Sequence, residues 1–187
     1  MGSEGVFQLF KNKKVRLIFR TVVLTALIAA TIAVIYLNSL KDNPVLAEGD
    51  DAPNFMLERL DSNEVIELDQ LKGKGVMINF WATYCEPCKK EMPYMEELYK
   101  EYQDKGIEIV AVSVDKNRMV IENFYNRFDL SFPLVHDKKG TIMELYQVQP
   151  LPTSFFINPD GTIERVVKGP LTLDRLETYF KEILPKN

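Results

Sequence analysis

The sequence contains few of the residues that build metal sites. Its 187 residues include only two cysteines and one histidine. A structural zinc site needs four ligands, and two thiols with His136 supply at most three. We therefore expect no bound metal, and we interpret His136 as a surface residue.

Other features are missing as well. Basic residues are not in excess, because the formal net charge is −4, and this argues against a protein that binds nucleic acid. The chain shows no internal repeat and no low-complexity tract, which argues against a solenoid or a disordered protein. Methionine and aromatic residues recur at helical spacing, as expected of a hydrophobic core. We expect no cofactor.

The longest apolar segment lies near the N-terminus. Residues 21–37 carry no charged side chain, and as a helix they would span roughly 26 Å of a bilayer. Residues 17–19 extend the segment if Arg20 directs its charge toward the membrane surface. Basic residues crowd the N-terminal side, namely Lys11, Lys13, Lys14 and Arg16. The positive-inside rule predicts a cytoplasmic segment 1–16, a transmembrane signal-anchor 17–37, and a catalytic domain on the outer face of the cell membrane.

The alternative is a signal peptide that is cleaved after Ala47. Val45-Leu46-Ala47 has the small-residue pattern of a cleavage site. It lies far beyond the apolar run, which favours a retained anchor, and both interpretations place the domain outside the cell. Residues 38–51 are polar and are predicted to form a linker, so the domain is expected to comprise residues 52–187.

This domain alternates between strand and helix patterns. A small hairpin is predicted at 55–60 and 64–68, and further strands at 76–81, 107–114, 132–135, 153–157 and 162–168. Helices are predicted at 86–103, 117–128 and 141–146, and a last helix carries Leu173, Leu176, Phe180 and Ile183, with Thr172 as its N-cap. The order predicts an α/β fold in which helices flank a central mixed β-sheet and an extra β-hairpin precedes it.

The two cysteines form either a structural disulfide or a redox pair. Cys85-Glu86-Pro87-Cys88 lies where a buried strand is followed by a helix. A helix N-terminus favours a thiolate, and i, i+3 spacing lets the disulfide open and close within one turn. Pro87 is tolerated in the first turn because its missing N–H is not required there. A loop this short removes little chain entropy, so we favour redox chemistry over structural stabilisation.

Several segments together resemble a known family. They are Asp51-Ala52-Pro53-Asn54-Phe55, Leu71-Lys72-Gly73-Lys74-Gly75, Asn79-Phe80-Trp81-Ala82, Cys85-Glu86-Pro87-Cys88-Lys89-Lys90-Glu91, Pro93-Tyr94-Met95, Pro150-Leu151-Pro152-Thr153 and Ile157-Asn158-Pro159. From Glu48 to Leu184 the chain resembles the membrane-anchored TlpA/ResA-type thiol–disulfide oxidoreductases of the thioredoxin superfamily. The resemblance implies a thioredoxin-like fold.

The resemblance also implies roles for individual residues. Cys85 would be the attacking thiol and Cys88 the resolving thiol, and Pro152 would be cis and lie against the disulfide. The substrate-binding surface would comprise Trp81, Tyr84, Glu86, Pro87, Leu151, Pro152 and Thr153. Members of this type reduce the haem-attachment CxxCH disulfide of apocytochrome c, with electrons from a membrane thiol carrier of the CcdA type.

Four residues near the cysteines adjust this expectation. Asn79 stands where thioredoxins usually carry a buried aspartate, and an amide cannot relay a proton. We hypothesise that Glu91 takes over this role as a catalytic residue, the alternative being a solvated glutamate on the helix surface. Glu86 opposes a thiolate electrostatically and so favours a reductant. Tyr84 replaces the tryptophan that the family usually has before its first cysteine, which puts the shape of the substrate-facing rim in question.

Three rival functions remain. A thiol peroxidase would need Pro and Thr or Ser seven and three residues before the reactive cysteine, where this chain has Ile78 and Ala82. A Sco-type copper-binding protein would use CxxxC with a distant histidine, whereas the spacing here is CxxC and His136 is the only histidine. A general or sporulation-linked extracytoplasmic disulfide reductase would use the same chemistry, and the residues do not distinguish it from a cytochrome c maturation protein.

Overall fold

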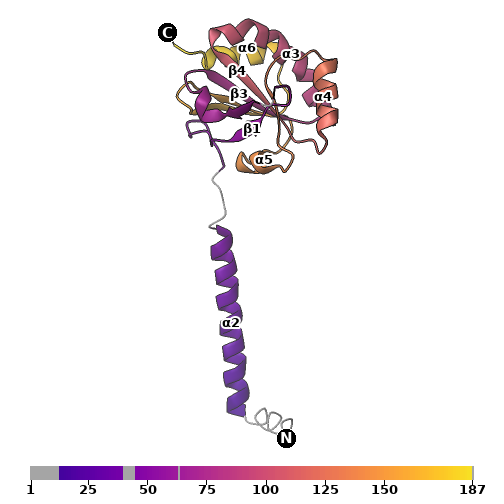
Figure 1. Ribbon diagram of the computed structural model, residues 1–187. Helices are drawn as coiled ribbons and strands as arrows, with labels where there is room; N and C mark the ends of the chain where they lie inside the picture. The colour runs from indigo at the N-terminus through magenta and orange to yellow at the C-terminus, as the bar shows by residue number, and fades with distance from the viewer. Residues whose placement is uncertain (1–12, 40–44, 63, 187) are drawn as a thin grey trace. The chain divides into compact units, whose positions relative to one another are not determined.

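The computed structural model describes residues 13–39, 45–62 and 64–186 (Figure 1). The chain divides into two compact units after Pro44. The first contains the helix α2 (Lys13–Ser39), and the second contains the β-sheet and the remaining helices. Most of the predicted segment 1–16 and residues 40–44 of the predicted linker lie outside the described residues.

Helix α2 is long and apolar enough to cross a membrane over Lys13–Leu37. The hydroxyl groups of Thr21 and Thr25 donate hydrogen bonds to carbonyl oxygens one turn earlier, at 2.8 and 3.0 Å. These polar groups are therefore satisfied within the helix, as an apolar surrounding requires. The helix begins four residues before the predicted span 17–37.

The second unit is built on a five-stranded sheet in the order β5-β4-β3-β6-β7. Its strands are β3 (Gly75–Trp81), β4 (Ile107–Ser113), β5 (Leu134–His136), β6 (Thr153–Ile157) and β7 (Ile163–Lys168). β3, β4 and β5 run parallel, whereas β6 is antiparallel to both β3 and β7. All seven residues of β3 are buried, as expected for the middle strand of a sheet covered on both faces.

Helices cover one face of this sheet, and a hairpin with a short helix covers the other (Figure 1). The first layer contains α3 (Glu86–Tyr102), α4 (Arg118–Arg127) and α6 (Leu173–Glu182). The second contains β1 (Met56–Glu58), β2 (Val65–Glu67) and α5 (Thr141–Leu145). The predicted thioredoxin-like fold with a mixed sheet and an added hairpin is confirmed.

The register of the parallel strands places three loops side by side. Trp81 pairs with Ser113, and Ser113 pairs with His136, so the carboxyl ends of β3, β4 and β5 meet at one edge of the sheet. The loop after β3 leads to Cys85, which is the N-cap of α3. The loop after β4 therefore lies next to the loop that leads to Cys85, and the loop after β5 lies on the far side of the β4 loop.

The structure differs from the sequence-based expectations at a few positions. Thr172 is the N-cap residue of α6, but its side chain makes no capping hydrogen bond. Part of the predicted linker pairs with β7, since Gly49 N donates to Ile163 O at 2.7 Å and Ile163 N donates to Asp50 O at 2.8 Å.

Gly75 lies against the end of α6, where a Cβ atom would collide with the carbonyl group of Ile183.

Candidate active site

The two cysteines form a disulfide at the N-terminus of α3. Their Cα atoms are 5.3 Å apart, and Cys85 Sγ accepts a hydrogen bond from Cys88 N at 3.3 Å. Cys85 is 9% exposed, whereas Cys88 is completely buried. Pro87 lies in the first turn of α3, where no N–H is required. Only one sulfur of the pair is therefore near the surface.

Glu91 lies one turn beyond Cys88 and is buried, with 1% of its surface exposed. Its Oε1 accepts a hydrogen bond from Asn79 Nδ2 at 2.9 Å, and its Oε2 accepts one from Leu171 N at 2.9 Å. Burial raises the pKa of Glu91 to about 7, although both hydrogen bonds favour the ionised form. The alternative of a solvated surface glutamate is therefore wrong, because α3 packs this face against β3 and the segment before α6.

Asn79 connects Glu91 to the neighbouring strand. Its Nδ2 also donates to Ser154 Oγ on β6 at 3.0 Å, as the pairing of Asn79 with Ser154 in the sheet allows. The Oδ1 atom of Asn79 is buried and has no hydrogen-bond partner among the described residues. Three buried polar side chains, those of Ser154, Asn79 and Glu91, thus form a hydrogen-bonded chain beneath the helix that carries the disulfide.

The segment before β6 lies beside the loop that precedes Cys85. Phe80 pairs with Thr153 in an antiparallel register, so Pro152, the residue before Thr153, lies at the level of Trp81. The Leu151–Pro152 peptide bond is cis, as the family resemblance implied, and the Gln149–Pro150 bond is also cis. Thr153 Oγ1 donates to Pro150 O at 2.6 Å, and Gly169 N donates to Pro152 O at 2.8 Å. The first bond closes a turn within the segment, and the second ties the segment to the residue that follows β7.

The charge of Glu86 is partly neutralised. Its carboxylate forms an ion pair with Lys89 Nζ at 2.6 Å, and the ammonium group of Lys89 holds the pKa of Glu86 below its usual value. From the sequence, Glu86 is expected to oppose the Cys85 thiolate as an unpaired charge. With Lys89 beside it, that effect is weaker than the sequence alone suggested.

Comparisons with known proteins agree with this geometry. Residues 48–166 match the AhpC/TSA family. Thiol-disulfide oxidoreductase ResA of Oceanobacillus iheyensis is 50% identical over 180 residues, which are 94% of this chain and 93% of the relative. ResA of Bacillus subtilis is 44% identical over 93% of this chain and 97% of its own length. The chain belongs to the AhpC/TSA family and, within it, to the ResA thiol–disulfide oxidoreductases.

Solved structures of related proteins have the same fold as this ResA-family chain. A thiol:disulfide interchange protein from Chlorobium tepidum, described as DsbE, is 31% identical with a TM-score of 0.69, covering 74% of this chain and 98% of its own. StoA from Bacillus subtilis is 32% identical with a TM-score of 0.61, covering 68% of this chain and 96% of its own.

The residues predicted to bind substrate differ in their exposure. Tyr84 is 72% exposed, Glu86 and Pro87 are exposed, and Leu151 is half-buried. Trp81, Pro152 and Thr153 are buried. The ring of Trp81 packs against Phe124, with centroids 4.9 Å apart. In this oxidised state of the ResA-family domain, Tyr84, Glu86, Pro87 and Leu151 reach the surface, whereas Trp81 lies in the core.

Two residues of this site were not anticipated from the sequence. Asp115, at the end of β4, accepts hydrogen bonds from the backbone and the hydroxyl group of Thr83, two residues before Cys85. His136, interpreted as a surface residue, is half-buried, and its Nε2 lies 2.7 Å from Asp115 O. The available signal was that Asp115 follows β4 and His136 ends β5, two parallel strands whose carboxyl ends meet at the edge carrying the CxxC motif.

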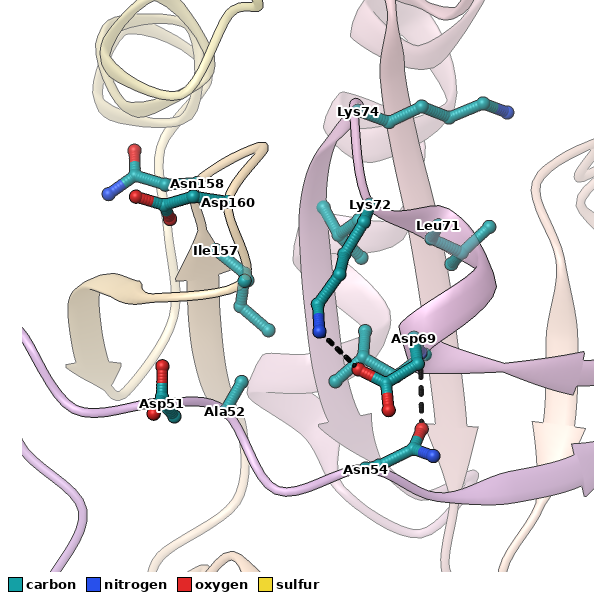
Figure 2. A pocket seen from close by; sticks show the side chains of 13 residues that line it. Asp51, Ala52, Asn54, Asp69, Leu71, Lys72, Lys74, Ile157, Asn158 and Asp160 are labelled. Carbon is teal, nitrogen blue, oxygen red and sulfur yellow. Dashed lines mark hydrogen bonds and ion pairs between the residues drawn. The ribbon is translucent and has the colours of Figure 1, made fainter.

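The cavities elsewhere do not belong to this site. A cavity of about 280 Å³ lies at the opposite end of β3. Figure 2 shows the side chains that line it, which are both polar and apolar and include Asp51, Asp69, Lys72, Asn158 and Asp160. Lys72 and Asp69 form an ion pair of 2.7 Å within it. Among the described residues, no group of three or more His, Cys, Asp or Glu side chains is arranged to hold a metal ion.

Proposed function

We propose that this protein is an extracytoplasmic, membrane-anchored disulfide reductase in which Cys85 attacks the substrate and Cys88 resolves the intermediate. Family membership supplies the chemistry of thiol–disulfide exchange. The observation that carries the proposal is the position of Glu91, a buried carboxyl with a pKa of about 7 one turn beyond the buried Cys88. We infer that this carboxyl serves as the base for the Cys88 thiol, which must lose its proton for the second step.

The reaction has two exchange steps. The Cys85 thiolate attacks one sulfur of the substrate disulfide, so the Cys85–substrate bond forms, the substrate S–S bond breaks, and the departing thiolate takes up a proton. Cys88 then gives its proton to Glu91 and attacks Cys85 Sγ, which releases the second substrate thiol. The substrate gains two electrons, and Cys85 and Cys88 become the disulfide seen in the structure.

The order of the two cysteines follows from their exposure. A protein substrate can reach Cys85, which lies at the N-terminus of α3 where the helix dipole stabilises a thiolate. Cys88 has no exposed surface, so it is suited to attack within the enzyme. Because Cys88 attacks from within the enzyme, the substrate needs to approach only the sulfur of Cys85.

The substrate we propose is the oxidised CxxCH disulfide of apocytochrome c, and the electron donor a membrane thiol carrier of the CcdA type. Support for both comes from the resemblance of the active-site segments. Helix α2 would anchor the domain, with the basic residues before it on the cytoplasmic side. Residues 1–16 would then be cytoplasmic, and the catalytic domain would face outward.

The decisive experiment is the equilibrium reduction potential of the Cys85–Cys88 couple, measured with the full chain in detergent micelles. A value near that of thioredoxin, roughly −270 mV, is expected of a reductant. A value near −120 mV would mean an oxidant that introduces disulfides, and the proposal would be wrong. Oxidised CxxCH peptides are tested next against an unrelated disulfide peptide, and equal rates would favour a general or sporulation-linked reductase over cytochrome c maturation.

A further inference from the structure

The loop between β3 and α3 is held by a side chain from another strand. Within the loop, Cys85 N donates to Ala82 O at 3.1 Å. The two donors of Thr83 both reach Asp115, with the backbone N–H bonding Oδ2 at 2.8 Å and the hydroxyl group bonding Oδ1 at 2.7 Å. One carboxylate therefore binds the backbone and the side chain of the residue two positions before Cys85.

Asp115 is itself fixed in several ways. It is 4% exposed, and Ser113 Oγ donates to its Oδ2 at 2.9 Å. Its own N–H donates to Ser113 Oγ at 3.2 Å, and its carbonyl oxygen lies 2.7 Å from His136 Nε2. The carboxylate cannot rotate without breaking its bonds to Ser113 at the end of β4 and to Thr83, so β4 fixes the position of Thr83.

The place of this contact, two residues before Cys85, argues for a role beyond stability. The Asp115 carboxylate accepts three hydrogen bonds, but it takes part in none of the ion pairs of the described part of the chain. A buried charge without a cation carries a desolvation penalty that an apolar contact in the same place would not. The penalty is offset by a short, bidentate contact with Thr83, which lies two residues before the reactive cysteine.

We propose that Asp115 is a positioning residue for thiol–disulfide exchange, acting through Thr83 to hold Cys85 at the N-cap of α3 in both redox states. This inference rests on the proposed use of Cys85 and Cys88 in exchange. When the disulfide is reduced, the two thiols are no longer joined, and the contact between Asp115 and Thr83 keeps them close. The effective concentration of one thiol at the other therefore stays high.

Two consequences of losing Asp115 act in the same direction. A looser loop lowers the effective concentration of the Cys88 thiol at Cys85, which makes the disulfide easier to reduce. Removing a negative charge near Cys85 favours its thiolate, which stabilises the reduced form. Both make the reduction potential less negative, and the looser loop also slows closure of the disulfide.

The test compares Asp115→Asn with Asp137→Asn in the full chain. Asp137 is a matched control because it is 3% exposed and its carboxylate accepts three backbone hydrogen bonds, from Thr141, Ile142 and Met143 at the start of α5. Each variant is equilibrated with glutathione buffers at pH 7. The chain has one tryptophan, and Trp81 packs in the same core as both cysteines, so its fluorescence reports the redox state.

We expect Asp115→Asn to lower the equilibrium constant for disulfide formation at least tenfold, a rise of about 30 mV in potential, and to slow disulfide closure. Asp137→Asn should lose stability but keep the wild-type potential. Thr83→Val removes only the hydroxyl bond and should shift the potential in the same direction by a smaller amount. Thr83→Ser keeps the hydroxyl group and should have the wild-type potential. These Thr83 variants decide the matter even if Asp115→Asn does not fold.

The outcomes separate this proposal from the proposed function. If Asp115→Asn or Thr83→Val keeps the wild-type potential and closure rate, Asp115 has only a structural role and the inference is overturned. The same holds if Asp137→Asn shifts the potential as much as Asp115→Asn does. If instead the wild-type cysteines do not exchange with glutathione at all, the proposed function itself is refuted.

Discussion

Asn79 donates a hydrogen bond to Glu91 across 2.9 Å in the buried layer between β3 and α3. An acid at position 79 would share a proton with Glu91, and the two groups would titrate as a pair. An amide has no proton to give up, but it can donate to an ionised carboxylate or accept from a neutral one. The pair therefore leaves Glu91 as the group that titrates, held in one place whatever its protonation state.

The stability of the oxidised protein should fall as the pH rises through the titration of Glu91. Its pKa is raised from 4.5 to about 7 in the folded state. Between these values the folded protein binds a proton that the unfolded chain has released, so the free energy of unfolding decreases by about 3 kcal/mol from pH 4.5 to above 7. We expect this decrease in the wild type and a much smaller one in Glu91→Gln, measured by urea unfolding across this range.

The disulfide makes this comparison direct, because cysteines joined in a disulfide do not titrate. In the reduced protein the same substitution should change the pH dependence of thiol titration, since Glu91 and Cys88 then titrate as a coupled set. An unchanged thiol titration in Glu91→Gln would contradict the proton-transfer role. Equal stability profiles for the two oxidised proteins would contradict the raised pKa.

Substitution of each cysteine should have a different result. Cys88→Ser keeps the attacking thiol of Cys85, which lies nearer the surface, and lacks the resolving one, so it should accumulate a mixed disulfide with an oxidised CxxCH peptide. Cys85→Ser leaves only the buried Cys88 and should form little of this adduct. Mass spectrometry of the intact protein measures both. More adduct with Cys85→Ser than with Cys88→Ser would reverse the assigned order of attack.

Glu86 and Lys89 form an exposed ion pair, and substitutions of the two residues should shift the reduction potential in opposite directions. Lys89→Gln removes a positive charge and leaves Glu86 unpaired, which disfavours the Cys85 thiolate and should make the potential more negative. Glu86→Gln should make it less negative. Because the pair is exposed, each shift should stay below about tenfold in the equilibrium constant and shrink in 1 M salt. Shifts of the same sign would show that these residues act through helix structure and not through charge.

The sequence carried enough information to predict the fold and the chemistry of the pair. Strand and helix patterns are local, and the CxxC motif sits at a strand-to-helix junction that both patterns mark. The depth of Glu91 was not predictable in this way. Spacing places it on the Cys88 side of the helix, but its burial depends on the segment before α6, where Leu171 N bonds its carboxylate from 80 positions away in the chain.

Other parts of the site depend equally on distant contacts. Thr83 and Asp115 are separated by 32 positions, and only the register of β3 with β4 brings their loops together. Lys89 lies three residues after Glu86, a spacing visible in the sequence, and the ion pair between them weakens the effect expected of Glu86. Trp81 was assigned to the substrate surface from the resemblance, and the sheet-to-helix packing buries it.

Tyr84 is the most exposed aromatic residue of the loop before Cys85, at 72%, and we expect it to contact the substrate protein. Truncating an exposed aromatic anchor at a protein contact often costs more than 1 kcal/mol of binding. Tyr84→Ala should therefore lower kcat/KM for an oxidised CxxCH peptide by about tenfold, with no measurable change in stability. Reduction of oxidised glutathione, which is too small to need this contact, should change by less than about twofold.

Two further variants make the result for Tyr84 interpretable. Tyr94→Ala removes an aromatic side chain that is 41% exposed farther along α3, and it should leave both rates unchanged. Tyr84→Trp introduces the residue that the family usually carries and should keep the rate with the peptide. If Tyr84→Ala slows glutathione and the peptide equally, the ring acts on the reactivity of Cys85. Substrate recognition would then have to rest on Glu86, Pro87 and Leu151, the other predicted contact residues that reach the surface.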